Sequence, residues 1–349
     1  MKQELTMRLL TQNDLFESGC YDIGMAIEVT ENALRDYNNG DILYPEKISQ
    51  IFNEQTQDRI NCLPATLLKE KICGMKWVSV FPDNPIRFGC TNVSAVIVLS
   101  EIEKGYPIAF LEGTMCSALR TAAISTVAAK YLAPSTVETI GFIGSGEQAK
   151  MHFMAMKSMF KSIKICKVAS RKSESEKKFV KELSNFYPDV KFELCNTDYE
   201  KATINTDIIV TAISGQTPLL KAEWIKKGCL YCHVGGWEDE YEVALKADKI
   251  VCDHWESVKH RTQTISRLYK TGKLSDEDIY SDLDKIVSGQ IVGREHDHEF
   301  IYFNAVGLSY VDVALGYKMY QMALQKDKGK DWSLATKGCF DYPRELYNI

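Results

Sequence analysis

Three cationic residues in the first third of the chain stand among apolar neighbours. They are Lys47, Lys76 and Arg120. Burying a cation without a partner is costly, so each must face water, an internal carboxylate or a ligand anion. Taken singly, water or an internal partner explains each of them. Taken together, they indicate a cleft that holds a carboxylate substrate, with Arg120 suited to a bidentate clamp.

Candidate proton-transfer groups follow a strand-like run in the second half of the chain. The segment 233–240 reads His-Val-Gly-Gly-Trp-Glu-Asp-Glu, at the end of an apolar run that begins at Cys229. Ligands collect at the carboxyl ends of parallel strands, so an acid there is well placed for general acid–base catalysis. The alternative interpretation is an acidic, solvated loop after a Gly-Gly turn.

A glycine-rich turn lies near the middle of the chain. Gly144, Gly146 and Ala149 have the G-x-G-x-x-A spacing, after the apolar run 139–143 and before the helix-like run 151–156. The first glycine permits a tight turn, the second lets the backbone approach a pyrophosphate, and the small third residue permits close helix packing. The N–H groups and dipole of the helix would hold the phosphates. The motif therefore predicts a dinucleotide site.

The residues after the next strand-like run favour NADP over NAD. An Asp or Glu about twenty residues past the glycines often binds the ribose 2′-OH of NAD. Here Ser170, Arg171 and Lys172 occupy that region, and a hydroxyl followed by two cations suits a 2′-phosphate. The alternative is that Ser170 or Ser173 simply caps the following helix.

The amino-acid composition limits which classes of partner are expected. The 349 residues carry a net charge of -5, with 26% charged and 45% hydrophobic residues, which is typical of a globular protein. A nucleic-acid partner is not expected, because there is no basic bias and no dense Lys/Arg run. No membrane span is expected either, because no stretch of about eighteen apolar residues occurs. The expected partner is a small molecule.

The cysteines and histidines indicate neither disulfides nor a metal. The eleven cysteines are an odd number in mostly apolar runs, which favours free thiols in a reducing cytoplasm. Cys229 and Cys232 have C-x-x-C spacing within a strand-like run rather than at a helix start, so redox chemistry is not expected. His296 and His298 lie in a charged loop, and we expect a surface loop without a metal.

The first part of the chain mixes helix and strand patterns. Helical spacing covers 23–37, and an alanine-rich helical run covers 117–131. Together with the strand-like runs, these patterns predict an α+β domain on an antiparallel or mixed sheet. The strand-like runs are 47–52, 59–63, 72–80, 94–99 and 107–111.

From about residue 137 to 304, strand and helix patterns alternate, which predicts a parallel sheet with right-handed crossovers. The last helical run is 309–325, and a charged, lysine-rich tail follows it. The expected strands are 138–143, 163–169, 191–194, 208–212, 229–234 and 249–252.

Five motifs, in this order along nearly the whole chain, resemble the ornithine cyclodeaminase/mu-crystallin family. They are 74–79 with 84–85, 119–123, 144–149, 234–236, and 306–308 with 312–314. The resemblance implies an α/β fold, in which a Rossmann-type doubly wound parallel sheet is joined to an α+β substrate and dimerisation domain. Residues 1–130 with 309–349 would form the substrate domain, and residues 131–308 the Rossmann domain. It also implies a homodimer that binds NAD or NADP.

The resemblance further implies chemistry at the Cα–N bond of an amino acid. Members cyclodeaminate ornithine or lysine, reduce cyclic imines, or dehydrogenate alanine or arginine. One branch oxidatively cleaves N-(2-amino-2-carboxyethyl)-L-glutamate to 2,3-diaminopropionate and 2-oxoglutarate in siderophore synthesis. Lys47 and the runs 59–64, 76–77 and 83–85 resemble that branch most. An NAD(P)-dependent amino acid dehydrogenase is therefore expected, with a cyclodeaminase or a cyclic ketimine reductase as alternatives. A cofactor-binding protein without catalysis, as in the crystallin branch, is a further alternative.

The resemblance assigns roles to individual residues. Lys76 and Arg120 match the carboxylate-binding lysine and arginine, and Lys47 falls where many members have an arginine. Lys76 would also belong to the catalytic centre. The residues implied in cofactor binding are Thr121, Gly144, Ser145, Gly146, Glu147, Gln148, Ser170, Arg171, Lys172, Thr211, Ala212, Ser214, Val234, Gly235, Val306 and Gly307.

The chain departs from the family pattern at two points. Trp237 follows the Gly-Gly pair where the family commonly has an aspartate, so Glu238 is expected to be the acid/base, with Asp239 as second choice. Ser170 and Arg171 replace the acidic residue of NAD-using relatives, so NADP is favoured and NAD is possible. This second departure weakens direct transfer of the siderophore role.

Overall fold

The computed structural model describes residues 5–335, 341 and 343. Its contacts divide the chain into two compact units, Met1–Asp22 with Asp41–Ser117 and Asp312–Ile349, and Ile23–Gly40 with Ala118–Val311. The expected boundaries placed 23–40 and 118–130 with the first unit. The contacts place them with the second, where helix α2 (Ile23–Asn38) packs against α5 (Glu147–Met159) and α11 (Leu283–Val287).

The first unit is built on a mixed sheet with the strand order β16-β1-β7-β6-β5-β4-β2, and β3 pairs with β4 off this path. β1 is parallel to β7, and the other pairs are antiparallel, as the sequence predicted. The strands are β1 (Leu5–Leu10), β2 (Ile42–Leu43), β3 (Ile48–Asn53), β4 (Asp58–Leu67), β5 (Ile72–Val80), β6 (Val93–Glu101), β7 (Pro107–Glu112) and β16 (Lys330–Ala335).

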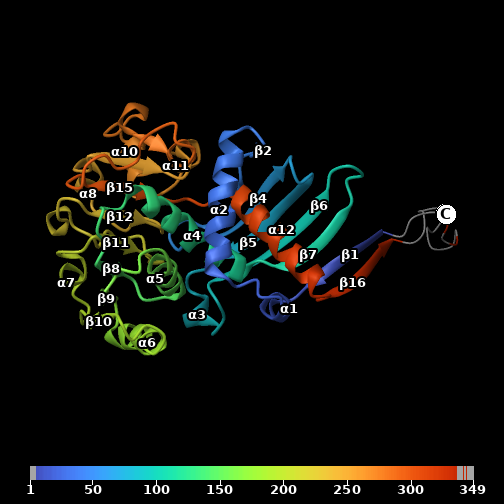
Figure 1. The fold of residues 1–349 in the computed structure, drawn as a ribbon, viewed down its shortest axis with the longest axis horizontal. Helices are drawn as coiled ribbons and strands as arrows, with labels where there is room; N and C mark the ends of the chain where they lie inside the picture. The colour runs from blue at the N-terminus through green and yellow to red at the C-terminus, as the bar shows by residue number, and fades with distance from the viewer. Residues whose placement is uncertain (1–4, 336–340, 342, 344–349) are drawn as a thin grey trace. The chain divides into compact units, whose positions relative to one another are not determined.

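One face of this sheet carries the core of the unit. Alternate residues of β4, β5 and β6 are buried on it, and Figure 1 shows α12 (Ser309–Gln325) lying across the strands. Isoleucine 97 of β6 lies against Gly316 of α12, since a Cβ at Gly316 would be 3.2 Å from it. The other helices of this part are α1 (Gln12–Glu17), α3 (Asn84–Arg87) and the start of α4 (Thr114–Leu132).

The structure corrects the sequence prediction at one end of this sheet. The lysine-rich stretch after residue 325 was expected to be a tail, yet Lys330–Ala335 forms β16 and pairs with β1. The β16 residues are all exposed, so no hydrophobic alternation marks the strand. Its position depends on backbone pairing and on Arg8, which contacts Asp331 at 2.9 Å and Asp327 at 2.8 Å.

The second unit contains a parallel sheet with the strand order β10-β9-β8-β11-β12-β15-β13-β14. The order reverses at β8, where the chain crosses from one half of the sheet to the other. The Rossmann-type, doubly wound sheet is therefore confirmed. The strands are β8 (Thr139–Ile143), β9 (Ile165–Ala169), β10 (Lys191–Leu194), β11 (Ile208–Thr211), β12 (Leu230–His233), β13 (Lys249–Cys252), β14 (Ser281–Asp282) and β15 (Ile301–Asn304).

Helices connect most of these strands and pack around the sheet (Figure 1). The second unit also contains α2, α5, α11 and the part of α4 from Ala118 onward. Its other helices are α6 (Ser173–Leu183), α7 (Tyr199–Thr203), α8 (Tyr241–Leu245), α9 (Trp255–Val258), α10 (Thr264–Lys270), η1 (Ala222–Trp224) and η2 (Asp276–Asp278).

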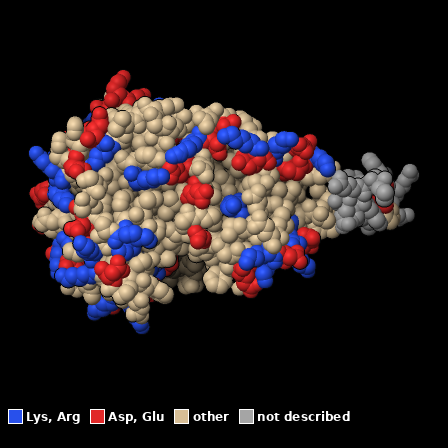
Figure 2. All heavy atoms as spheres, viewed as in Figure 1, with Lys and Arg blue, Asp and Glu red and all other residues tan. Residues whose placement is uncertain are grey.

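Acidic and basic side chains are interspersed over the face shown in Figure 2, without a broad area of one sign. Among the helices of the described residues, none has the length and hydropathy needed to cross a membrane.

Candidate functional site

The carboxyl edge of the parallel sheet collects most of the residues predicted to bind a dinucleotide. Parallel strands end on the same side, so the segments that follow β8, β9, β11, β12 and β15 meet at one edge. All predicted cofactor residues except Thr121, which lies on α4, are at the ends of these strands or just beyond them.

Gly144 makes the tight turn that leaves β8. Its φ is +110°, a conformation that side chains rarely adopt, and a Cβ there would lie 2.4 Å from the carbonyl oxygen of Ala212. The Gly144 N–H donates to Ala169 O at 2.8 Å. The turn therefore runs directly over the neighbouring strand ends, and only glycine fits without strain.

The N-terminus of α5 is open. Gly146 is its N-cap, with no side-chain cap hydrogen bond, and a Cβ at Gly146 would meet no atom within 4 Å. Glu147 in the first turn pairs with Lys150. Backbone N–H groups at such a helix start are suited to phosphate oxygens, so this turn fits the pyrophosphate of a dinucleotide.

The segment after β9 forms a tight turn with two exposed cations. The Ser170 hydroxyl donates to Lys172 O at 2.9 Å, and the Ser170 N–H donates to Glu176 at 2.9 Å. The buried Glu176 carboxylate also accepts from the N–H groups of Asn196 and Thr197, each at 2.8 Å. Arg171 and Lys172 are exposed, so the turn presents positive charge.

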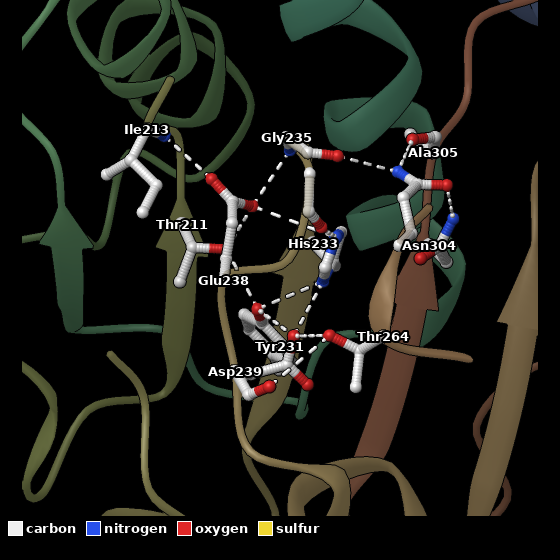
Figure 3. A network of polar contacts seen from close by, with 12 residues as sticks. Thr211, Ile213, Tyr231, His233, Gly235, Glu238, Asp239, Thr264, Asn304 and Ala305 are labelled. Carbon is white, nitrogen blue, oxygen red and sulfur yellow. Dashed lines mark hydrogen bonds and ion pairs between the residues drawn. The ribbon is translucent and has the colours of Figure 1, made fainter. Parts of the chain in front are cut away.

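Glu238 is buried and holds the loop after β12 to the end of β11 (Figure 3). It accepts from the hydroxyl of Thr211 at 2.7 Å, the N–H of Gly235 at 2.8 Å and the N–H of Ile213 at 2.7 Å. These three donors supply hydrogen-bond partners for both oxygens of the carboxylate. In this geometry Glu238 fixes the backbone of its own loop and of the segment after Thr211.

Asp239 is equally buried and pairs with His233 (Figure 3). His233 Nδ1 lies 2.8 Å from Asp239 Oδ1, and His233 Nε2 lies 2.7 Å from the carbonyl oxygen of Gly236. Burial opposes protonation of His233, but Asp239, and after it Glu238 and the Gly236 carbonyl, raise the imidazole pKa above its ordinary value. Both ring nitrogens face acceptors, which stabilises the imidazolium.

Hydroxyl groups complete the surroundings of Asp239. Thr264 donates to Oδ1 at 2.6 Å, and the hydroxyls of Tyr231 and Tyr302 each lie 3.3 Å from it. Burial, and then the charge of Asp239, raise the pKa of both tyrosines. The second oxygen, Oδ2, has no hydrogen-bond partner among the described residues. Hydrogen bonds therefore satisfy Oδ1 of Asp239, whereas Oδ2 has no donor among the described residues.

Gln263 links the loops that follow β12 and β15. Its side-chain amide donates to Gly235 O at 2.9 Å and to Ala305 O at 3.0 Å. Its oxygen accepts from Asn304 at 2.9 Å, and Gln263 itself is only 5% exposed. These contacts couple the positions of the two loops.

Asp253 holds the turn after β15. Its Oδ2 accepts from the N–H groups of Val306 and Gly307, each at 2.8 Å. Burial raises the pKa of Asp253 to about 6, although both N–H donors oppose the shift. The turn is therefore fixed by a carboxylate that lies far from it in sequence.

Gly307 leaves room for the guanidinium of Arg120. Its φ is +89°, and a Cβ on it would lie 2.6 Å from Arg120 Nη1. A side chain at position 307 would be strained and would displace Arg120. The predicted substrate-binding arginine and a predicted cofactor residue are thus in direct contact.

In the first unit, Lys76 is fully buried on β5. Its Nζ donates to Asp312 Oδ1 at 2.6 Å and to Ser117 Oγ at 3.1 Å. An internal carboxylate therefore balances this cation. Lys47 lies just before β3 and is partly exposed.

The sequence reasoning missed several residues of these networks. Asp253 and Gln263 were not singled out, although Asp253 directly follows the buried strand β13. His233 was included only as one member of the candidate proton-transfer run 233–240, without a role of its own. Arg59 and Asn61 on β4 were noted only for their resemblance to one family branch.

Of the predicted C-x-x-C pair, Cys229 directly precedes β12 and Cys232 lies inside it. Cys229 and Cys232 are buried and unbridged, and burial raises the pKa of Cys229 to about 12. The rings of His296 and His298 stack with centroids 5.4 Å apart. Within the described residues, no group of three or more His, Cys, Asp or Glu side chains could hold a metal ion.

Comparison with known proteins identifies the family. The profile of the ornithine cyclodeaminase/mu-crystallin family matches residues 9–327. The chain belongs to this family. N-((2S)-2-amino-2-carboxyethyl)-L-glutamate dehydrogenase of Staphylococcus aureus is 30% identical over 332 residues, which cover 94% of this chain and 98% of that protein. The predicted resemblance is therefore confirmed.

Two solved structures of the ornithine cyclodeaminase/mu-crystallin fold superpose closely. Delta(1)-pyrroline-2-carboxylate reductase of Thermococcus litoralis, in complex with NADH and L-proline, has a TM-score of 0.87 and 29% identity, covering 93% of this chain and 99% of that one. An archaeal alanine dehydrogenase dimer with bound NAD has a TM-score of 0.86 and 29% identity, covering 95% and 100%.

Proposed function

We propose that this protein is an NAD(P)-dependent oxidoreductase that acts on the Cα–N bond of an amino acid or its imine. The observation that carries the proposal is the carboxyl edge of the parallel sheet, where the Gly144 turn leads into the open N-terminus of α5. The relatives that hold NADH or NAD support the same interpretation.

The residues of this edge fit a dinucleotide. The segment 144–148 would hold the pyrophosphate, and the exposed Arg171 and Lys172 favour NADP by offering positive charge to a 2′-phosphate. Glu176 is engaged by three backbone N–H groups, so it does not compete for a ribose hydroxyl. When bound, the nicotinamide group supplies hydride transfer to or from the substrate Cα.

The first-choice reaction is dehydrogenation of a carboxyalkyl or diamino acid. Cα loses a hydride and nitrogen loses a proton, which leaves a C=N bond. Water then adds to that carbon, and cleavage of the C–N bond releases a 2-oxo acid and an amine. The dehydrogenase from Staphylococcus aureus, at 30% identity, supports this choice.

The substrate carboxylate is assigned to Lys47, Lys76 and Arg120. Lys76 has no exposed surface, so its contact with a substrate requires a local opening of the structure around it. Asp312 and Ser117 hold the ammonium group of Lys76 in one position, and Gly307 leaves space for the Arg120 guanidinium. Fixed cations orient a carboxylate with little loss of side-chain entropy.

Proton transfer by Glu238 or Asp239 stays a prediction. Neither side chain has exposed surface, so direct contact with a substrate requires opening of the loop 234–239. In this geometry, Glu238 positions the backbone of Gly235 and Asp239 positions the imidazole ring of His233.

A homodimer is supported by exposed apolar residues on β3. Ile48, Ile51 and Phe52 are 63%, 49% and 58% exposed, and Trp77 of β5 is 40% exposed. Ile48 and Trp77 share one face of the sheet, since each pairs with Cys62, and exposed apolar side chains on one face favour an interface with another copy. The dimeric archaeal relative supports the same assembly, and sedimentation velocity measures it directly.

The decisive experiment incubates the purified protein with NADP or NAD and a panel of amino acids, while absorbance of the reduced cofactor and the amine product are both recorded. Reduction of the cofactor in step with product supports the dehydrogenase. Product without net reduction of the cofactor identifies a cyclodeaminase instead.

A second candidate function is reduction of a cyclic imine, favoured by the similarity to the pyrroline carboxylate reductase. It is tested by following NADPH or NADH oxidation with Δ1-pyrroline-2-carboxylate. If the protein binds a dinucleotide but turns over neither the amino acids nor the imine, the proposed activity is wrong.

A further inference from the structure

Arg59 is a partly buried cation on β4 without a carboxylate partner. Its Nη1 donates to the carbonyl oxygen of Gln57 at 2.8 Å, and no ion pair involves it among the described residues. Burial lowers the pKa of the guanidinium. Its neighbour Asp58 points to the opposite face, because successive side chains of a strand alternate. Arg59 therefore has N–H groups left over that could donate to an anion, and no carboxylate among the described residues accepts from them.

Asn61, two residues further along β4, is a second unsatisfied polar group. It is only 7% exposed, and its Oδ1 has no hydrogen-bond partner in the described part of the chain. A buried amide that lacks a partner is unfavourable unless a ligand or water completes it. The amide offers both a donor and an acceptor, depending on its orientation.

Both residues lie on the face of the sheet that carries Lys76. Leu63 is directly opposite Lys76 in the antiparallel register, and Asn61 is opposite Val78. Side chains at Leu63, Asn61 and Arg59 share one face, because they are separated by steps of two. Lys76, Asn61 and Arg59 therefore form a polar line along a single face.

A buried apolar cluster lies beside Lys76, Asn61 and Arg59. Leu63, Val78 and Ala95 form a buried cluster, with Val80 and Val93 packed against it. Val80 is the register partner of Arg59. The backbone positions opposite Lys76 and at Arg59 are four residues apart, or about 13 Å at about 3.3 Å per residue. A ligand that contacts both cations therefore needs a flexible chain between its two carboxylates.

We propose that Arg59, with Asn61 beside it, selects a substrate that carries a second carboxylate at the end of its side chain. The inference rests on the proposed function, in which Lys76 belongs to the site for the α-carboxylate. The substrate class is then a dicarboxylic amino acid or an N-carboxyalkyl derivative of one. Arg59 is suited to the second carboxylate because a guanidinium binds carboxylates in a bidentate manner.

The experiment compares Arg59→Gln with the wild-type protein on acidic and neutral substrates. L-Glutamate and L-aspartate represent the acidic class, and L-alanine and L-norvaline the neutral class, each with NADP and with NAD. Lys104→Gln is the matched control, because it removes one positive charge at an exposed turn of the same unit. Arg59→Lys tests rescue by charge alone.

We expect Arg59→Gln to lower kcat/KM for acidic substrates by about 10- to 100-fold, mainly through KM, because a charged hydrogen-bond pair is lost. Neutral substrates and Lys104→Gln should stay within about twofold of the wild type, and Arg59→Lys should recover part of the loss. Equal losses on both classes, or wild-type preference for neutral substrates, would overturn the inference.

A binding measurement separates this inference from the proposed function. The thermal midpoint is recorded for each variant with and without L-glutamate or L-alanine, which also reports whether Arg59→Gln folds. Stabilisation of the wild type by glutamate that Arg59→Gln loses supports the acidic subsite even if no substrate is turned over. If glutamate stabilises both proteins equally, Arg59 does not select the second carboxylate.

Discussion

The imidazole of His233 and the carboxylate of Asp239 form a buried pair, with Nδ1 and Oδ1 2.8 Å apart. Neither side chain has exposed surface. The Gly-Gly turn between them therefore closes over a buried histidine–aspartate pair, and the loop that follows β12 has a titratable group, His233, at its base.

Replacing His233 by Gln should remove a pH-dependent part of the stability. The folded-state pKa is raised, so folding favours the protonated form. Its contribution is fully present below the unfolded pKa of about 6.5 and is lost as pH rises through the raised folded pKa. Breaking a buried pair costs about 3 kcal/mol.

Urea unfolding of the wild type and His233→Gln between pH 6 and pH 10 measures this effect. The difference between the two proteins should shrink as pH increases. His298→Gln, at an exposed loop position, is the control and should show no such trend. A difference independent of pH would argue against a charged His233.

Replacing Gly307 by Ala should disturb Arg120 as well as the backbone. Gly289 provides the matched control, because its φ is +75° but a Cβ on it meets nothing within 4 Å. Gly289→Ala should cost about 1 kcal/mol of unfolding free energy from backbone strain alone. Gly307→Ala should cost more and should also raise KM for the amino acid. If both variants keep the wild-type KM, contact with Gly307 is not what positions Arg120.

Gly146→Ala should separate dinucleotide binding from folding. A Cβ at this position has open space around it and the φ is -77°, so the fold should be kept, with only a small loss of stability because alanine is a poorer N-cap than glycine. If the pyrophosphate approaches this backbone, the Kd for the cofactor should rise about tenfold, which is about 1.4 kcal/mol. Calorimetric titration with NADPH and NADH measures it. Gly144→Ala, by contrast, should lower the thermal midpoint. If Gly146→Ala binds the cofactor with the wild-type Kd, the pyrophosphate does not lie against this backbone.

Arg171→Ala should weaken NADPH binding more than NADH binding, by about tenfold, because only NADPH carries the 2′-phosphate. Lys177→Ala, an exposed position on α6, controls for a general loss of positive charge. Titration of both cofactors against both variants gives the ratio directly. If Arg171→Ala loses affinity for the two cofactors equally, Arg171 does not favour NADP over NAD.

The regular elements could be predicted because their patterns are local. The strand at 191–194 and the last helix at 309–325 have the predicted bounds, since each carries its own periodicity. The turn at Gly144 was equally predictable, because the spacing of small residues is itself the signal. The family resemblance allowed the fold of the whole chain to be predicted, in addition to these single elements.

The burial of Glu238 could not be predicted from its sequence neighbourhood. An acidic run after two glycines is typical of a solvated loop, and the donors that bury Glu238 come from Thr211 and Ile213 on another strand end. The grouping of α2 with the second unit could not be predicted for the same reason. The helices that α2 packs against, α5 and α11, lie more than one hundred residues away in sequence. Long-range contacts of this kind leave no local pattern.

The pairing of β1 with β16 joins segments that are more than three hundred residues apart. During synthesis, β1 therefore emerges long before its partner, and its outer edge stays open until β16 follows. An unpaired strand edge is a site for association with other chains. The second unit, by contrast, is complete in sequence by Val311. The order of translation thus favours a parallel sheet that folds early and a mixed sheet that closes last.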